Sequence, residues 1–409
     1  MEINKIDLHK FIKSYLFIAI MIIAASCNKQ LPDATPIIYS PINNSTTSIG
    51  SLLSNDTTYS FFKAAATKSG MLAQLNDSTN VFTVFLPNNA AFRVSGIPSL
   101  AVVNSLPPTV LGGIVGYAII PGKQYTSADI PATFPNIQLP TSLTIGTLPG
   151  TSLSLKLSTF PSVRANGFWD NNIPVLMPDM KMQNGVVHLV AAIVAPPSQL
   201  LRSALYSNPN LTYFKAAIAR ADSGQTGLNR IDSLLGYAVT NMTVLAPVDS
   251  AFQKLLFGSI YGALLAQGLP QAQAFGAAQA LSSTPDVFSD SALFSVLTAT
   301  KVRGIVVYHF LATDMGSGFQ PNIRAFSVNF SPTPTFYTTL VNSAFAAHPG
   351  INGQATFTGP FVTSLQFTGL GTFPPGGAPY SDAPAKAISL DNHAVNGVYH
   401  VIDKVLLPQ

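Results

Sequence analysis

Residues 81–92 read VFTVFLPNNAAF, and residues 243–252 read TVLAPVDSAF. Both stretches place a threonine and a valine, then a proline, then an alanine and a phenylalanine at the same spacing. The repeated positions include Thr83, Pro87 and Phe92 in the first copy and Thr243, Pro247 and Phe252 in the second. The chain therefore contains an internal repeat.

A second pair of matching stretches follows the first pair in the same order. Residues 184–196 (NGVVHLVAAIVAP) return as residues 396–408 (NGVYHVIDKVLLP). The copies lie too far apart for a solenoid, in which the period is about 20 to 50 residues. We therefore expect two tandem domains, residues 48–197 and 198–409. The closing stretches share Asn184, Gly185 and His188 with Asn396, Gly397 and His400.

These stretches resemble the two conserved boxes of the fasciclin-like (FAS1) family. In that family a Thr-Val-x-x-Pro-x-x-x-Ala-Phe box opens the module and an Asn-Gly-x-x-His strand closes it. The resemblance runs from about residue 48 to the C-terminus, apart from two insertions. It implies an α+β fold of two tandem modules, each a β-sandwich or wedge with packed α-helices. It also implies that His188 and His400 are structural, with ring nitrogens bonded to nearby backbone and polar groups.

The first box also predicts its own local structure. Residues 81–86 are apolar on both alternations, which indicates a strand buried on both faces, and Pro87 ends it. Asn88 or Asn89 then caps a short helix that buries Phe92. Apolar spacing predicts longer helices over residues 52–75, 101–120 and 198–221, and a closing strand over residues 186–194.

Composition limits the class of protein. Only 9% of the 409 residues are charged, against roughly 25% in an average soluble protein. The surface must therefore carry uncharged polar groups, which favours an exported protein. The formal net charge of +4 comes without a cluster of Lys and Arg, and phosphate binding requires such a cluster. We therefore expect no nucleic-acid partner.

Residues 1–26 resemble the signal peptide of a bacterial lipoprotein. Lysines precede an apolar run at residues 16–25, which is too short to cross a bilayer. The run ends at Cys27, the only cysteine of the chain and the expected lipidation site. A lipid there anchors a protein to a membrane without spanning it, and the outer membrane is the expected place. The alternative is an ordinary cleaved leader. Residues 27–47 are expected to form a tether.

Two insertions distinguish the second module, near residues 255–285 and 325–381, and neither contains a charged residue. Glutamines and Pro270 argue against a membrane span in the first, so we expect a helical hairpin with residues 271–281 helical. Turn signals and β-type runs in the second predict extra or lengthened strands. Its aromatic residues either fill an enlarged core or line a glycan or protein contact: Phe336, Tyr337, Phe345, Phe357, Phe361, Phe367, Phe373 and Tyr380.

No catalytic residue, cofactor or metal site is predicted. The chain has no Gly-x-Ser-x-Gly elbow and no His-Glu-x-x-His zinc motif. Tyr308 and His309 match a tyrosine–histidine motif that the resemblance associates with integrin contact in some animal members. Packing of a helix against the sheet is the alternative for this pair. Asp391, His393 and His400 would need a turn between them to share an ion.

The sequence as a whole predicts an adhesion or recognition lipoprotein at the cell surface. Its expected ligand is extracellular matrix, a glycan or another surface protein, with the insertions of the second module as the specific surface. Two alternatives remain, a carbohydrate-binding accessory of a glycan-uptake system and a purely structural envelope protein. An enzyme is the least favoured class, because no acid/base pair recurs in the motifs.

Overall fold

The computed structural model describes residues 45–147, 150–371 and 383–408. The predicted leader, Cys27 and most of the predicted tether lie outside these residues, as do Phe373 and Tyr380 of the second insertion. The described residues all belong to one compact unit, Pro41–Gln409. Among the helices of the described ranges, none has both the length and the apolar character that crossing a membrane requires.

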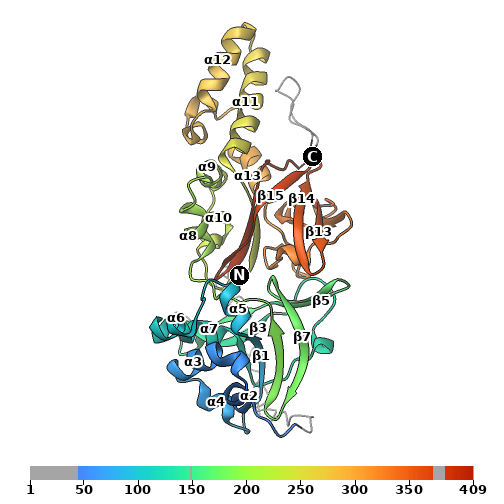
Figure 1. Ribbon diagram of the computed structural model, residues 1–409. Coiled ribbons are helices and arrows are strands. Elements are labelled where there is room, and N and C mark those ends of the chain that lie inside the picture. The colour runs from blue at the N-terminus through green and yellow to red at the C-terminus, as the bar shows by residue number, and fades with distance from the viewer. Residues whose placement is uncertain (1–44, 148–149, 372–382, 409) are drawn as a thin grey trace, which may run out of the picture. The chain divides into compact units, whose positions relative to one another are not determined.

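The first module combines short helices with a six-stranded sheet (Figure 1). Strand order in the sheet is β2-β1-β8-β7-β6-β5, and β3 and β4 form a separate two-stranded sheet. The helices are α2 (Ile49–Asn55), α3 (Ser60–Lys68), α4 (Leu72–Asn76), α5 (Asn89–Val94), α6 (Leu100–Ser105) and α7 (Pro108–Tyr117). The strands are β1 (Phe82–Pro87), β2 (Ile119–Pro121), β3 (Leu139–Thr147), β4 (Ser154–Thr159), β5 (Pro161–Arg164), β6 (Gly167–Asp170), β7 (Ile173–Met182) and β8 (Gly185–Val190).

The second module repeats this plan with longer elements. Its six-stranded sheet has the order β12-β13-β14-β15-β16-β9, and β10 pairs with β11. The helices are α8 (Leu201–Tyr206), α9 (Thr212–Ala221), α10 (Ile231–Leu235), α11 (Asp249–Ala266), α12 (Gln271–Leu281) and α13 (Ala299–Tyr308). The strands are β9 (Met242–Pro247), β10 (Thr313–Asp314), β11 (Phe319–Gln320), β12 (Thr335–Tyr337), β13 (Ile351–Thr358), β14 (Phe361–Thr368), β15 (Ala385–Ala394) and β16 (Gly397–Ile402).

The two boxes of each module are neighbours in its sheet. The first-box strand β1 pairs in parallel with the closing strand β8, and β9 pairs in parallel with β16 in the same way. The glycine of the closing box stands opposite the first residue of the box strand in both modules, Phe82 with Gly185 and Met242 with Gly397. The α+β fold with two tandem modules is therefore confirmed, whereas the exact limits of residues 48–197 and 198–409 stay a prediction.

Each first-box strand is buried on both faces, as its sequence predicts. Val84 and Leu86 pack against the helices of the first module, while Phe85 joins a second cluster on the opposite face. In the second module Val244 packs against the helices, and Leu245 belongs to the cluster on the opposite face. The predicted cap is also confirmed, because the Asn88 side chain accepts a hydrogen bond from the Ala91 amide at 2.8 Å.

The long predicted helices are wrong, because each is broken into shorter ones. Residues 101–120 form α6 and α7, and Leu106 between them is extended, with φ −67° and ψ 145°. Pro107 follows it, and a proline disfavours the helical conformation of the residue before it. Residues 52–75 divide into α2, α3 and α4, and residues 198–221 into α8 and α9. The closing strand stops at Val190, where its partner β1 ends at Pro87.

Both predicted insertions take the expected form. In the first module the helix after the box is short, α5, whereas the corresponding helix α11 continues through residue 266 and is followed by α12. Figure 1 shows α11 and α12 side by side, and the Phe257 and Phe275 rings lie 5.2 Å apart between them. The predicted helical hairpin is thus confirmed. In the sheet order β13 and β14 take the places of β5 and β6 but have eight residues each instead of four, and β12 is added at the edge. The prediction of extra or lengthened strands in the second insertion is therefore confirmed.

Candidate functional site

The threonine of each first box ties its strand, β1 or β9, to a chain segment that follows the last α-helix of the module before the closing strand. Both side chains are fully buried. Each hydroxyl donates to one carbonyl and accepts from one amide, so both of its hydrogen-bonding roles are filled. Thr83 Oγ1 bonds Lys123 O at 2.9 Å and the Tyr125 amide at 2.7 Å, and Thr243 Oγ1 bonds Ile323 O at 2.6 Å and the Ala325 amide at 2.8 Å.

The histidines of the closing boxes are buried and fully bonded. His188 Nδ1 accepts from the Asp179 amide at 3.2 Å, and Nε2 lies 2.8 Å from Tyr125 O. Because a carbonyl only accepts, Nε2 carries the proton and the ring is neutral. His400 repeats this arrangement with the Asp391 amide at 3.2 Å and Ala325 O at 3.0 Å. Burial lowers the pKa of both rings. The structure therefore gives both histidines a role in holding adjacent segments.

The asparagines of the closing boxes join each closing strand to the helices of its module. Asn184 Oδ1 accepts from the Ile49 amide at 2.9 Å, and Nδ2 donates to Leu75 O at 2.8 Å. Asn396 does the same in the second module, with the Leu201 amide at 2.8 Å and Leu235 O at 3.0 Å. The repeated threonines, histidines and asparagines are thus buried residues that hold adjacent segments together. None of them is among the described residues that line the clefts.

Tyr308 and His309 also lie in the interior, with neither side chain exposed. The Tyr308 hydroxyl donates to Gly350 O at 2.8 Å. His309 Nδ1 donates to Ile305 O at 2.8 Å, and Nε2 accepts from the Leu406 amide at 2.9 Å. Burial lowers the pKa of His309 to about 4. The pair packs the end of α13 against the sheet, and a binding role for it stays a prediction.

The residues that raised the question of a metal are each bonded elsewhere. Asp391 accepts from the Ser327 amide and hydroxyl, both at 2.6 Å, and His393 Nε2 accepts from Arg324 Nη1 at 3.0 Å. In the part of the chain that the structure describes, no three His, Cys, Asp or Glu side chains are grouped to hold a metal ion.

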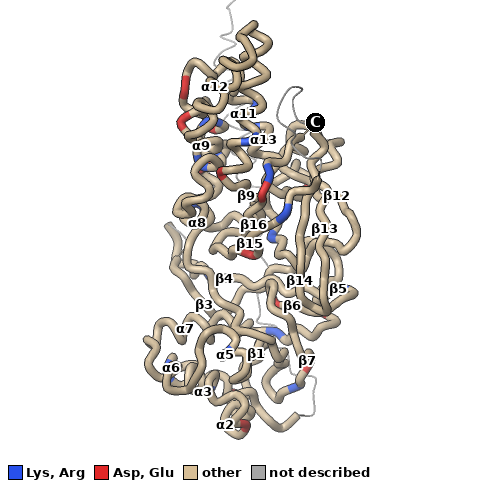
Figure 2. Tube along the Cα trace, turned by 45° about the horizontal axis from the view of Figure 1, so that its top comes forward, with Lys and Arg blue, Asp and Glu red and all other residues tan. Residues whose placement is uncertain are grey.

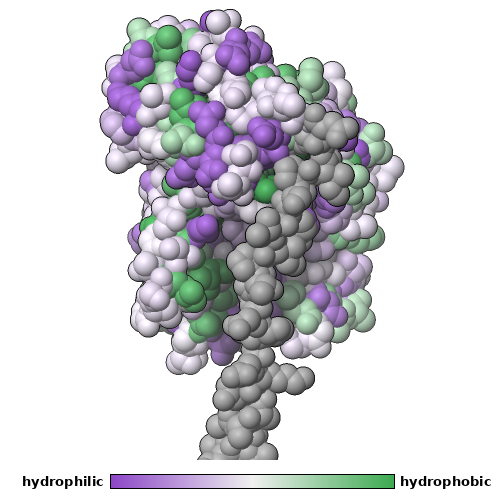
Figure 3. Space-filling view, turned by 90° about the horizontal axis from the view of Figure 1, so that it is seen from below, coloured by the Kyte–Doolittle hydropathy of each residue, from purple (hydrophilic) through white to green (hydrophobic). Residues whose placement is uncertain are grey.

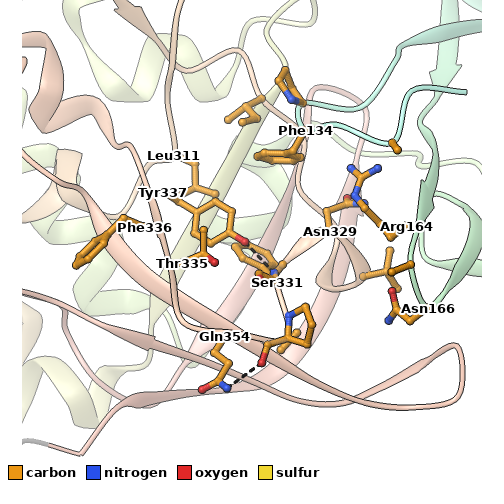
Figure 4. Close-up of a pocket in the computed structure, with 18 of the residues that line it drawn as sticks. Phe134, Arg164, Asn166, Leu311, Asn329, Ser331, Thr335, Phe336, Tyr337 and Gln354 are labelled. Atoms are coloured by element: carbon orange, nitrogen blue, oxygen red, sulfur yellow. Dashed lines mark hydrogen bonds between the residues drawn. The ribbon is translucent and has the colours of Figure 1, made fainter.

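The candidate site is a cleft of about 890 Å³ to which both modules contribute. Figure 4 shows Arg164 and Asn166 of the first module on one side and Thr335, Phe336 and Tyr337 of the second insertion on the other. The contributing elements are the end of β5, the loop around residue 134, β12, β13 and the segment before β12. A volume of this size suits a ligand of several rings.

Five aromatic residues of the described ranges line the cleft, and two of their rings lie in contact beside Leu311. Phe134 and Tyr337 meet edge to face with ring centroids 6.1 Å apart, and Phe336 is 50% exposed. Of the other candidate aromatics, Phe357 also lines the cleft, and Phe367 is a core residue. Phe345 and Phe361 are exposed outside it. Some of these aromatic residues therefore fill the core, as Phe367 does, and others line the cleft, as Phe336, Tyr337 and Phe357 do.

The electrostatics of the cleft depend on one residue. Charged residues are few along the chain trace (Figure 2), and Arg164 is the only charged residue among the described residues that line the cleft. Arg164 Nη1 donates to Val163 O at 2.8 Å, and Nη2 donates to Asn136 Oδ1 at 2.7 Å. None of the carboxylates in the described ranges forms a salt bridge with it. The cleft is therefore weakly cationic.

A second cleft, of about 530 Å³, lies in the second module and is lined by Lys215 and Arg220 of α9 and by residues around Asp286. It is smaller than the cleft to which both modules contribute.

The face in Figure 3 is mostly hydrophilic or weakly polar, and its apolar side chains form small separate groups. Exposed apolar side chains such as Val94, Leu153 and Phe345 belong to different parts of the chain. Single exposed apolar residues are normal on protein surfaces. The cleft of about 890 Å³ is consequently the surface on which recognition is best argued.

Sequence reasoning named Phe336, Tyr337 and Phe357 but missed Phe134, Arg164 and Asn329. These three come from segments that are far apart in sequence and meet only where the modules touch. Asn136 Nδ2 of the first module donates to Asn329 Oδ1 of the second at 2.8 Å, and Asn329 Nδ2 donates to Ser162 Oγ at 3.0 Å. No local pattern marks these residues. The sequence offers one indication of them: charged residues are scarce in this chain, so each arginine is a candidate for a specific role.

Comparison with known proteins gives three findings. The family model described as the Fasciclin domain matches residues 57–196. Protein sll1483 of Synechocystis sp. is 25% identical over 176 residues, which make up 42% of this chain and 87% of that protein. A FAS1 domain pair from the insect cell adhesion molecule Fasciclin I matches with a TM-score of 0.31 and 14% identity. That match covers 85% of this chain and 96% of the other.

FAS1 domains are generally linked to adhesion or recognition, and they are typically non-enzymatic. The family model covers the first module. The second module shares with it both repeated boxes, the parallel pairing of the box strands, and the buried threonine, histidine and asparagine side chains. The chain is therefore similar to the fasciclin (FAS1) domain family, and the family match itself falls on the first module.

Proposed function

We propose that this chain is an adhesion or recognition protein of the bacterial cell envelope that acts by binding and not by catalysis. Its ligand is extracellular matrix, a glycan or another surface protein, and the cleft between the two modules is the binding site. The observation that carries the proposal is the composition of that cleft. Partly exposed aromatic rings, side-chain amides and one arginine surround about 890 Å³ of space.

These groups favour binding over reaction chemistry. General acid–base catalysis needs titratable groups placed against the substrate, and Arg164 and Tyr337 are the titratable side chains among the described lining residues. Burial raises the pKa of Tyr337, so it is neutral at physiological pH. Aromatic rings with a few polar groups are typical of recognition surfaces. The same lining favours a glycan, which also keeps the role of a carbohydrate-binding accessory open as a second function.

Replacing Phe336 tests the site. Phe336→Ala is expected to weaken ligand binding roughly tenfold, because truncating an aromatic anchor at an interface typically costs 1–2 kcal/mol or more. The measurement is binding of the full-length chain, purified in detergent, to an array of polysaccharides and matrix proteins. Phe345→Ala is the matched control, since Phe345 is 69% exposed in the same insertion but does not line the cleft. Equal binding by both variants would exclude the cleft.

The second part of the proposal is attachment to the outer membrane through lipid on Cys27. The supporting feature is the leader sequence, with lysines, a short apolar run and a single cysteine at its end. Cys27→Ser is expected to move the protein from the membrane fraction to the soluble fraction, because the acyl chains supply the attachment. Fractionation and the mass of the mature N-terminus measure this. An unchanged mass or an unchanged distribution would refute the anchor.

A further inference from the structure

We propose that the cleft recognises an acidic polysaccharide, with the carboxylate of a uronic acid unit on Arg164 and a sugar face on the neighbouring aromatic rings. The inference rests on the proposed function and adds the chemical class of the ligand. The inference is based on Arg164, whose half-buried guanidinium lies in a cleft of ligand size. No carboxylate in the described ranges pairs with it.

The guanidinium is held in place before any ligand arrives. Asn136 Oδ1 accepts from Arg164 Nη2, and Asn136 Nδ2 donates in turn to Asn329 Oδ1 across the module boundary. Asn329 is itself fixed, since its Oδ1 also accepts from the Phe326 amide at 2.8 Å and its Nδ2 donates to Ser162 Oγ. A chain of side-chain amides therefore orients the arginine. Such preorganisation lowers the entropy that binding must offset.

The guanidinium has more donors than these contacts use. It carries five N–H groups, and its hydrogen bonds go to Val163 O, to Asn136 Oδ1 and, at 3.4 Å, to Pro131 O. Two further N–H groups are enough for the paired contact that arginine makes with a carboxylate. A carboxylate is therefore the group that this corner of the cleft fits.

The rest of the cleft selects a sugar over other acidic partners. Phosphorylated and strongly acidic peptides are bound by clusters of cations, whereas this cleft supplies one. A single positive charge matches one carboxylate, which a single uronic acid unit at Arg164 supplies. Exposed aromatic faces such as Phe336 suit the apolar face of a sugar, and the polar groups of Gln354 and Thr335 suit its hydroxyls.

The test compares two polymers that differ only in charge. Binding of the full-length chain in detergent is measured with polygalacturonate and with its neutral methyl ester. The wild type is expected to prefer the acid by about tenfold or more, the worth of a charge-assisted paired contact. Arg164→Gln is expected to abolish that preference, because the charged paired contact with the carboxylate is lost. Arg164→Lys keeps the charge but not the paired geometry, and should retain part of the preference.

Controls separate this inference from the proposed function and from misfolding. Arg230→Gln removes an exposed arginine outside the cleft and should keep the full preference. Unchanged fluorescence of the single tryptophan, Trp169, confirms that a variant is folded. A wild type that binds both polymers equally, or a folded Arg164→Gln that keeps the preference, overturns the inference alone. Failure to bind any array component overturns the proposed function as well, and binding only to an acidic protein overturns the sugar class.

Discussion

Gly185→Ala is expected to lower the free energy of unfolding of the first module by about 3 kcal/mol or more, the upper range for overpacking. A Cβ at this position would lie closer than 3.0 Å to the carbonyl oxygen of Phe82. Gly185 and Phe82 are paired residues of the parallel strands β8 and β1. Neither strand can retreat without breaking the pairing at the centre of the sheet, so the added methyl group has no room.

A matched substitution separates this clash from the general effect of replacing a glycine. Gly276 lies inside α12, and nothing stands within 4 Å of the Cβ that alanine would add there. Gly276→Ala should therefore stabilise by about 0.5–1 kcal/mol. Trp169 of the first module is fully buried where the two modules meet, so its fluorescence during denaturant unfolding reports the loss of that packing. A Gly185→Ala midpoint equal to that of the wild type would contradict the close approach.

The second large effect concerns pH and the buried carboxyl of Asp170. Asp170 is fully buried, the Thr159 hydroxyl donates to its Oδ1, and its Oδ2 has no hydrogen-bond partner among the described residues. Burial raises the pKa of Asp170 from 3.8 to about 7. The folded protein therefore holds this proton over a range in which the unfolded chain has already released it.

The sign of the effect follows from proton linkage. Stability from the protonated carboxyl is fully present below pH 3.8 and is lost as pH rises towards about 7, because folding then requires an uptake of a proton or the burial of a charge. A shift of about three pKa units corresponds to at most about 4 kcal/mol in the free energy of unfolding. Relative to Asp170→Asn, which has no such proton, the wild type should lose stability by up to that amount between pH 4 and pH 8.

The measurement is the difference in unfolding free energy between wild type and Asp170→Asn at several pH values. The buried histidines also respond to pH, but they are common to both proteins and cancel in the difference. Asp314→Asn, at an exposed position, is the control for replacing a carboxylate that is not buried. A flat difference for Asp170→Asn would show that its carboxyl is ionised in the folded state despite its burial.

The sequence predicted the parts of the fold that are determined locally or by the repeat. The strand of the first box, its end at Pro87, the Asn88 cap and the helical hairpin all follow from short patterns of apolar residues, prolines and capping side chains. The breaks in the longer helices were missed. Apolar spacing continues across residues 101–120, but Pro107 and the extended Leu106 divide the segment, and a helical period alone does not register such a break.

The cleft was only partly predictable, for a different physical reason. The aromatic residues of the second insertion attract attention because that segment lacks charge. Arg164, Asn136 and Asn329 acquire their relationship only through the contact between modules, where Trp169 Nε1 also donates to Pro360 O at 2.8 Å. Contacts of this kind depend on how two folded surfaces meet. No pattern within either segment encodes that meeting.

The parallel pairing of the box strands has a consequence for how these modules change over time. Each pair joins strands from opposite ends of a module, so its formation closes a long loop. The entropy cost of closure grows only with the logarithm of loop length, about 0.6 kcal/mol for each doubling. Residues added between the boxes therefore cost little, and both insertions of the second module lie there. New binding surfaces can accumulate in that interval while the pairing that defines the module stays intact.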